Sequence, residues 1–463
     1  MPAELVPARA IVTVRRMLRV LFAVLAGLVS ASALTACALP QAPAPVREPA
    51  SASPAAARVP APALLPVARL PLLDHEPVLG VLLARAPRIA LELSARVELA
   101  AGTTRRTLAP GTHTFEARAG VLVLGGENWR EPDTLASGGE PRYALDALPK
   151  FGAPRRLKLA GDLVVRADGN ELEVIERIPM EAYLASVVGA EMNAKWPTAA
   201  LAAQAIVARS YAAARWMEKS GEPWQLHWHF GVDMAYHGWS ESNATVAKAI
   251  ASTRGEVLIH AGFPVLALFH ASSGGRTESF ERIKPGVFAP DRKTPIAAAM
   301  PVVTDDAALL GAEGLKLSAT HGRWKADLPL PEVGAALQRW SAEDKSRPRL
   351  GTLEAVSITA RHDDSGRVKS VSLRHALDGQ TRFTELAATD FRMAVSPVKI
   401  RSLAWDRCVI AAKSPGYLVL EGRGFGHGCG LSQVSAWYLA TQGESPERIV
   451  ARFYAGAKIE RRY

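Results

Sequence analysis

The sequence predicts an α+β fold with mostly antiparallel strands and a few segregated helices. Between about residues 78 and 178, short apolar stretches alternate with turn residues, which is the pattern of consecutive strands. The period then changes to that of helices in two segments, and strand patterns return from residue 255. Strands and helices that cluster in separate parts of a chain are typical of the α+β class.

The strand-rich part begins with five short segments and ends with a hairpin. Asp168-Gly169 supplies the turn of the hairpin, because this dipeptide suits the backbone twist of two paired strands. The strands expected here are 78–84, 89–95, 96–101, 113–118, 120–126 and the two halves of 156–178.

Helices are expected where alanine and the 3.6-residue period dominate. Pro179 opens a helix over 179–192, and Trp196-Pro197 separates it from a second helix over 198–219, which Thr198 is expected to cap. Ser432 and Gly443 have the residue types that begin and end a later helix. The remaining expectations are strands at 255–260, 263–271, 353–363, 366–375 and 416–424, and helices at 330–340 and 445–454.

The charge of the chain favours an acidic partner. The net charge is +10 over 463 residues, and a basic protein attracts nucleic acid, anionic lipid or anionic wall polymer. The arginines are dispersed, however, and no basic cluster with interleaved aromatic residues is present. We therefore expect no nucleic-acid partner.

The N-terminal segment has the features of an export signal. Arg15, Arg16 and Arg19 precede an apolar run that is too short to span a membrane. The run leads to Leu34-Thr35-Ala36-Cys37, which is similar to a bacterial lipobox, where the cysteine carries the lipid. An ordinary signal peptide with an incidental cysteine is the alternative, and translation starts at Met1 or at Met17.

The predicted organisation follows from this signal. Residues 1–36 are expected to be a lipoprotein signal peptide, 37–72 a Pro/Ala-rich tether, and 73–463 the folded domain. Export would place Cys408 and Cys429 in an oxidising space. A disulfide between them and two free buried thiols are both compatible with the sequence.

One carboxylate and one glycine-rich stretch are the strongest candidates for chemistry. Glu191 follows an uncharged run at the end of a helix, so burial is expected to raise its pKa, as suits a general acid. A capping or solvated carboxylate is the alternative. Gln204 lies inside an apolar run, where it either hydrogen-bonds in the core or lines a cleft. The stretch GRGFGHGCGLSQ, residues 422–433, alternates glycines around His427 and indicates close backbone approach.

Three stretches in order resemble the stage II sporulation protein D family (SpoIID/LytB), whose members remodel bacterial peptidoglycan. They are EAYLASVVGAEMNAKWPTAALAAQAIVARSYA, the region from DMAYHGW to FHASSGGRTE, and GRGFGHGCGLSQVSAW. The resemblance extends from about residue 78 to residue 463. It implies a lytic transglycosylase that cuts peptide-denuded glycan strands in a glycan-binding cleft.

The resemblance also implies the roles of individual residues. Glu191 matches the catalytic acid/base. The positions that match substrate-binding residues are Gln204, Arg209, Ser273, Gly274, Gly275, His427, Ser432 and Gln433. The alternating glycines would then let the backbone lie against a glycan strand, with a purely structural turn as the alternative. Some members bind zinc near the SGG loop, but only His270 is present in that stretch, so no metal and no cofactor are expected.

The chemistry agrees with a single glutamate. Hydrolytic glycosidases usually need two carboxylates, whereas in lytic cleavage the 6-hydroxyl of the sugar attacks C1 and one Glu serves as acid and base. Two departures, Asn193 in place of proline and Ala202 in place of lysine, favour a second hypothesis, in which the protein binds glycan and enhances an amidase. A lipoprotein that only tethers the wall to the membrane is a third hypothesis. Export to the envelope, at the outer membrane's periplasmic face if there are two membranes, is expected throughout.

Overall fold

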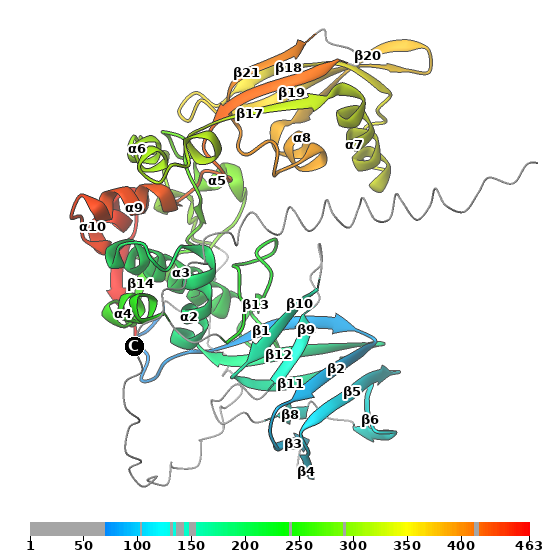
Figure 1. Ribbon diagram of the computed structural model, residues 1–463, viewed down its shortest axis with the longest axis vertical. Helices are drawn as coiled ribbons and strands as arrows, with labels where there is room; N and C mark the ends of the chain where they lie inside the picture. Colours follow the sequence, from blue (N-terminus) through cyan, green and yellow to red (C-terminus); the bar gives the residue numbers. More distant parts are fainter. Residues whose placement is uncertain are drawn as a thin grey trace, which may run out of the picture. The chain divides into compact units, whose positions relative to one another are not determined.

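The fold is described from a computed structural model, and Figure 1 labels its helices and strands. The described residues are 70–101, 104–129, 133–135, 143–147, 154–239, 243–289, 293–411 and 416–463. They all belong to one compact unit, Ala56–Tyr463. The predicted signal peptide, Cys37 and nearly all of the predicted tether lie outside the described residues, so those expectations stay predictions.

The N-terminal part of the described chain forms two sheets, one mixed but mostly antiparallel and one antiparallel. One has the strand order β13-β1-β12-β11-β8-β3-β4, where β13 pairs with β1 in parallel, and the other has the order β10-β9-β2-β5-β6-β7. Alternation of exposed and buried residues along β2 shows why these short segments are strands. Their bounds are β1 Val78–Ala86, β2 Arg88–Leu93, β3 Val97–Ala101, β4 Thr104–Leu108, β5 Gly111–Arg118, β6 Val121–Leu124, β7 Glu127–Trp129, β8 Asp133–Leu135, β9 Tyr143–Ala147, β10 Arg155–Leu159, β11 Asp162–Asp168, β12 Glu171–Pro179 and β13 Leu226–His227.

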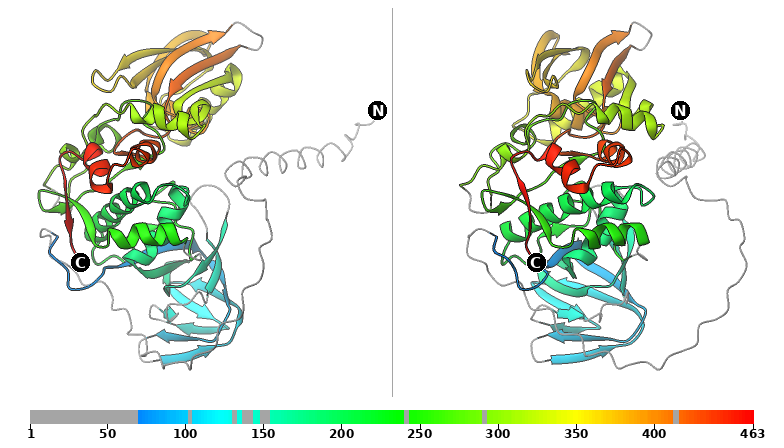
Figure 2. Two further views of the ribbon diagram at one scale, coloured as in Figure 1. Left: turned by 60° about the vertical axis from the view of Figure 1, so that its left-hand side comes forward. Right: turned by 90° about the vertical axis from the view of Figure 1, so that its left-hand side faces the viewer.

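A group of helices shares its hydrophobic core with these sheets. The long helix α3 contacts α2, α4, α9 and α10, and Figure 2 shows the last two, in red, beside the green helices. Small sheets connect this group to the chain's C-terminal end: β15-β14-β24, and the parallel pair β16-β23. The bounds are α2 Met180–Glu191, α3 Thr198–Glu218, α4 Ala244–Ser252, β14 Glu256–His260, β15 Phe263–Pro264, β16 Phe269–His270, α5 Phe280–Ile283, η1 Ala297–Ala299, α6 Ala307–Gly314, η2 Ser318–Gly322, β23 Leu431–Ser432, α9 Gln433–Thr441, α10 Pro446–Phe453 and β24 Lys458–Arg461.

Residues 323–423 have a second hydrophobic core of their own. Two three-stranded antiparallel sheets, β17-β22-β21 and β18-β19-β20, enclose it together with α7 and α8. Phe391 packs edge to face on Trp405, with ring centroids 5.9 Å apart. The bounds are β17 Arg323–Pro329, α7 Leu330–Glu343, β18 Thr352–Arg361, β19 Val368–Leu377, β20 Gln380–Ala387, α8 Ala388–Val395, β21 Ala404–Ala411 and β22 Tyr417–Arg423.

The α+β prediction is confirmed, as are most of the expected elements. Gly169 adopts φ +61° in the predicted hairpin turn between β11 and β12. Ser432 caps α9, accepting from the amide of Ser435, and Gly443 follows the helix end with φ +85°. The two cysteines of the described chain, Cys408 and Cys429, are free thiols. None of the described helices is long and apolar enough to cross a membrane.

Three local expectations were wrong. Thr198 does not cap α3, because it is already the first helical residue and Pro197 occupies the capping position without a side-chain bond. The stretch 263–271 is not one strand: β15 pairs with β14, whereas β16 pairs with β23, so the pairing partner changes within it. The first half of 156–178 is also two strands, β10 and β11, which belong to different sheets. The elements not predicted from the sequence include α4, α5, α6, α8, β4, β7, β8, β9, β17, β20, β21, β23 and β24.

Candidate functional site

Glu191 is the last residue of α2, where the helix ends before the Trp196-Pro197 break. Its side chain is half-buried, and its Oε1 accepts a hydrogen bond of 2.8 Å from the backbone N–H of Ala235. Burial raises the pKa of Glu191, and the Ala235 N–H and the Gln433 amide offset only part of this rise. The carboxyl therefore holds its proton to a higher pH than an exposed glutamate, as the sequence analysis expected.

Gln433 is brought to Glu191 from the far end of the chain. It is the first residue of α9, and its Nε2 donates to the backbone carbonyl of Glu191 over 3.2 Å. That carbonyl is in the last turn of α2, where helical carbonyls have no partner within their own helix. The contact fixes the end of α2 on α9, so two residues that the sequence analysis selected lie together.

Gln204 is a buried amide in the middle of α3. It is completely inaccessible to solvent, and neither its Oε1 nor its Nε2 has a hydrogen-bond partner among the described residues. The first alternative from the sequence, a hydrogen bond within the core, is therefore not what the structure shows. A buried amide without partners costs about 1–3 kcal/mol, which a ligand or a water molecule would offset.

Arg209 has a structural position instead of facing a ligand. It is fully buried and forms a two-pronged ion pair with Glu181, with Nε–Oε1 and Nη2–Oε2 distances of 2.9 and 2.7 Å. A further bond of 3.2 Å joins its Nη1 to the backbone carbonyl of Glu256. The guanidinium thus ties α3 to α2 and β14, and the predicted contact of Arg209 with substrate is not supported.

The residues of the SGG loop also turn inward. Ser273 donates to Asp305 over 2.6 Å, Ser435 donates to the same carboxylate over 2.7 Å, and Ser432 lies 2.7 Å from Ser435. All four side chains are fully buried. Burial raises the pKa of Asp305, and the serine hydroxyls offset part of the rise. The predicted substrate contacts of Ser273 and Ser432 are therefore not what this arrangement provides.

The glycines of both loops let the chain pack on itself. Gly274 lies against the backbone of Arg423, and Gly275 accepts from the amide of Asp305 through its carbonyl. A Cβ on Gly428, whose φ is +89°, would lie 2.4 Å from the buried guanidinium of Arg367. The protein's own atoms fill the space beside Gly274 and Gly428, so close internal packing explains these two glycines, and the contact of the loops with a glycan strand stays a prediction.

His427 belongs to the same internal packing. Its Nδ1 accepts from the backbone N–H of Cys429 over 3.0 Å, and its ring centroid lies 5.5 Å from that of buried His270. Burial, together with Arg367 and other cations nearby, lowers the pKa of His427 to about 4, although a backbone hydrogen bond with Phe269 opposes part of this shift. The imidazole is therefore neutral at pH 7, and it orders the glycine loop through the Cys429 amide.

Replacing Gly430 by Ala is expected to destabilise the protein strongly. Gly430 has φ +72°, and a Cβ there would lie 1.9 Å from the backbone oxygen of Leu268, which cannot move aside. Adding the backbone strain of about 1–2 kcal/mol to overpacking of about 1–3 kcal/mol gives a loss of about 2–5 kcal/mol in urea unfolding. Gly443→Ala is the matched control. Gly443 also has a positive φ, +85°, but no atom lies within 4 Å of the Cβ that alanine would add there. Equal losses in the two variants would contradict the packing argument.

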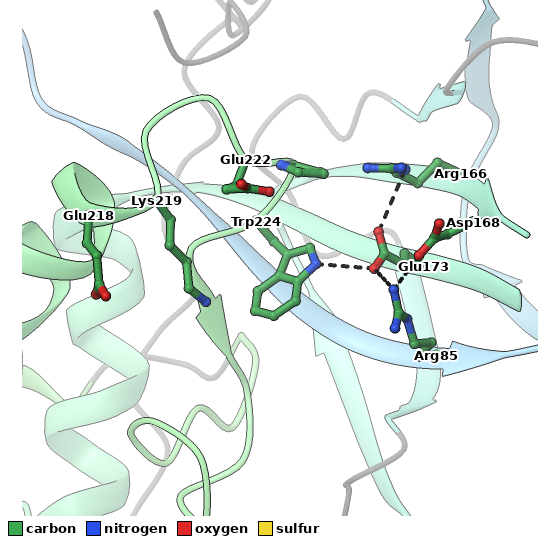
Figure 3. A pocket seen from close by; sticks show the side chains of 9 residues that line it. Arg85, Arg166, Asp168, Glu173, Glu218, Lys219, Glu222 and Trp224 are labelled. Carbon is green, nitrogen blue, oxygen red and sulfur yellow. Dashed lines mark hydrogen bonds and ion pairs between the residues drawn. The ribbon is translucent and has the colours of Figure 1, made fainter. Parts of the chain in front are cut away.

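A charged pocket of about 650 Å³ lies elsewhere in the fold, and Figure 3 shows its lining. Glu173, buried at its centre, lies 2.6 Å from Arg85 and 3.6 Å from Arg166, and it accepts from the indole of Trp224 over 3.3 Å. The ammonium of Lys219 lies 4.0 Å from a Trp224 ring centroid. The pocket lining has three basic and four acidic side chains, so charges of both signs are interspersed, and none of the predicted site residues lines the pocket.

No group of three or more His, Cys, Asp or Glu side chains is placed to hold a metal ion among the residues that the structure describes.

The group that contacts the Glu191 carboxyl, the backbone amide of Ala235, was not predicted from the sequence. A backbone donor has no side-chain signature, and Ala235 lies 44 residues from Glu191. Asp233, two residues earlier, was the available signal, because it is a carboxylate in an otherwise apolar and aromatic stretch.

Two family models match parts of the chain. Residues 168–260 match the model described as stage II sporulation protein, and residues 310–430 match a domain of unknown function, DUF8618. The first match contains Glu191, Ala235 and Asp233. The second lies mostly over the separate core of residues 323–423.

Several bacterial proteins are similar to this chain along much of its length. An uncharacterized protein of Brachyspira hyodysenteriae is 24% identical over 304 residues, which is 65% of this chain and 71% of that protein. Stage II sporulation protein D of Bacillus subtilis is 24% identical over 299 residues, 62% of this chain and 75% of that protein. The amidase enhancer of Bacillus subtilis is 25% identical over 292 residues, 60% of this chain and 40% of that protein.

Proposed function

Since the chain belongs to the stage II sporulation protein D family, we propose that it is a lytic transglycosylase of the bacterial cell wall. Its substrate would be peptidoglycan glycan strands from which the stem peptides have been removed, and Glu191 would be the general acid and base. The observation that carries the proposal is the raised pKa and the fixed orientation of this carboxyl. Burial raises the pKa of Glu191, while a backbone N–H fixes one of its oxygens.

The reaction needs only one carboxyl group. Protonated Glu191 would donate its proton to the glycosidic oxygen as the bond between that oxygen and C1 of the muramic acid breaks. The C6 hydroxyl oxygen of the same sugar would bond to C1, and its proton would pass to the Glu191 carboxylate. The carboxyl returns to its starting form, no water is consumed, and the product ends in a 1,6-anhydro ring. Because the attack is intramolecular, positioning supplies much of the rate.

The surroundings of Asp233 favour this reaction over hydrolysis. A hydrolytic glycosidase usually places a second carboxylate opposite the acid. Asp233 is on the loop that contacts Glu191, but its side chain is completely buried. It accepts hydrogen bonds from the Tyr211 hydroxyl and the His227 backbone N–H, and it is ion-paired with Arg215. A carboxylate so occupied does not activate a water molecule.

The test is an analysis of reaction products by mass spectrometry. Residues 38–463 are incubated with glycan strands stripped of peptides, and the ends of the released fragments are weighed. The proposal predicts ends of 1,6-anhydro-muramic acid, which are lighter by one water than the ends left by hydrolysis. Fragments with hydrolysed ends would replace the lytic mechanism by a hydrolytic one.

A second candidate function follows from the similarity to a protein named amidase enhancer. In this function the chain would bind glycan and increase the activity of an N-acetylmuramoyl-L-alanine amidase without cutting strands. Asn193 and Ala202, which depart from the family pattern, support it. Intact strands that bind the protein, together with faster amidase turnover when it is added, would favour this candidate.

We also propose that the protein is exported and attached to the envelope through a lipid on Cys37. The support is the order of a basic segment, an apolar run and a lipobox-like sequence in residues 15–37. Labelling with a radioactive fatty acid in cells would test this, since a Cys37→Ser variant should remain unlabelled.

A further inference from the structure

We infer that Asp233 is a positioning residue for Glu191. The inference rests on the proposed function, because it assigns Asp233 a role in presenting the acid of that reaction. Asp233 acts through the loop between β13 and Trp239, which has no regular secondary structure and carries the amide that contacts Glu191. The contacts of Asp233 with Tyr211, Arg215 and His227 are called the Asp233 clamp below.

The Asp233 clamp fixes one side of the loop to α3 and β13. The hydroxyl of Tyr211 donates to Oδ1 over 2.7 Å, and the backbone N–H of His227 donates to Oδ2 over 2.8 Å. Arg215 Nε lies 3.4 Å from Oδ1, and the Asp233 side chain is 0% exposed. A buried carboxylate needs such partners to stay charged, so the loop is fastened at Asp233 in one geometry.

The other side of the loop is fastened to α2 and to the neighbouring strands. The backbone N–H of His237 donates to Ser186 Oγ over 2.9 Å. The ring of Tyr236 stacks on Tyr183 at 5.2 Å, and its hydroxyl donates to buried Glu176 over 2.7 Å. Ala235 lies between these anchors and Asp233, so its N–H has little freedom, and its 2.8 Å bond holds the Glu191 carboxyl in one orientation.

Several titratable groups surround this loop and set the electrostatic background for the test. Tyr183, on α2, has a hydroxyl without a hydrogen-bond partner among the described residues. Burial, followed by the charges of Asp233, Tyr211 and Glu191, raises the pKa of Tyr183 well above the usual range. The groups that face Asp233 are Tyr211 and Arg215 from α3, Lys219 just after the end of α3, Tyr183 from α2 and His227 from β13.

Loss of the clamp has a defined consequence for Glu191. A hydrogen bond from Ala235 stabilises the charged form of the carboxyl, so weakening this bond raises the pKa of Glu191 further. The acid must be protonated to start the reaction, and activity falls as pH rises through that pKa. In a variant without the clamp, the alkaline limb of the pH–rate profile should therefore move to higher pH, while misorientation of the acid lowers kcat.

The experiment compares the wild type with Asp233→Asn and Tyr211→Phe in the full chain. For Asp233→Asn we expect kcat on denuded strands to fall about 10–100-fold with KM changed less than about twofold, because orientation is lost and binding is not. By hydrogen exchange, the Ala235 amide should exchange at least about tenfold faster, with the buried amide of Leu258 unchanged. Tyr211→Phe removes a single bond and should show the same changes at smaller size.

The control is Asp406→Asn, which removes an exposed, ion-paired carboxylate on β21, in the part of the chain that has the second core, and should change neither kcat nor exchange of the Ala235 amide. Unchanged kcat and unchanged Ala235 exchange in Asp233→Asn would overturn the inference and leave the proposed function standing. If the wild type makes no anhydro ends, the proposed function fails, and amide exchange still decides whether Asp233 positions Ala235. If Asp233→Asn does not fold, Tyr211→Phe carries the same test.

Discussion

Glu191→Gln is expected to slow the cleavage of denuded glycan strands by at least about 10²–10⁴-fold, the usual contribution of a general acid or base. Glutamine has the shape of protonated glutamate, and its side-chain oxygen can still accept from the Ala235 N–H that Glu191 Oε1 uses. It cannot give a proton to the glycosidic oxygen or take one from the 6-hydroxyl. Strand binding should therefore stay within about threefold of the wild type, because the substitution removes chemistry and not shape.

The measurement is the rate at which 1,6-anhydro ends appear, followed by mass spectrometry, with strand affinity measured beside it. Glu222→Gln is the matched control. It changes an exposed carboxylate that lines the charged pocket of Figure 3, and it should leave rate and affinity unchanged. If Glu191→Gln cleaved at more than half of the wild-type rate, Glu191 would not be the catalytic acid. If no form cleaved but both bound strands, the amidase-enhancer function would be favoured.

The sequence predicted the site best where a residue type is out of place in its surroundings. Glu191 after an uncharged run and Gln204 within an apolar run were selected because polar groups are rarely buried without a reason. The structure places Gln204 in the core, where its amide has no hydrogen-bond partner within the described part of the chain, and it places Glu191 beside Gln433. The distance of 242 residues between Glu191 and Gln433 is not readable from local pattern, and only the family resemblance brought the two together.

The alternating glycines predicted that other atoms lie close to the backbone of this stretch, but they could not show whether those atoms belong to a ligand or to the protein itself. In the stretch 422–430, Gly428 contacts Arg367 and Gly430 contacts Leu268, and both contacts depend on pairing between distant parts of the chain. The partner of Arg209 was equally unpredictable, since nothing in the sequence of the alanine-rich helix α3 indicates that its arginine pairs with Glu181 on α2. The α+β class was predictable because alternation and helical period are local, whereas the separate core of residues 323–423 depends on which sheets pack together.

Arg209→Met is expected to lower the free energy of unfolding by about 3–5 kcal/mol at pH 7, because it leaves the buried Glu181 carboxylate without a countercharge. Burial opposes the charged form of Glu181, but Arg209, Tyr463 and the Gly255 amide together lower its pKa below the ordinary value of 4.5. A carboxyl whose pKa is lowered by folding stabilises the protein above its unfolded pKa and loses this contribution as pH falls through the folded value. The difference between variant and wild type should therefore shrink below about pH 4.5.

Urea unfolding at several pH values measures this effect, and a second substitution separates charge from packing. In the double variant Arg209→Met/Glu181→Gln, part of the lost free energy of unfolding should be regained, because a neutral amide replaces the unpaired charge. Arg407→Met is the control for an exposed pair: Arg407 lies 3.2 Å from Glu421, both side chains are more than a third exposed, and the loss should stay below about 1 kcal/mol. A loss for Arg209→Met no larger than for Arg407→Met would show that the buried pair does not hold α2 on α3. Its assignment as a structural residue would then fail, and the substrate contact implied by the family resemblance would again be the better account of Arg209.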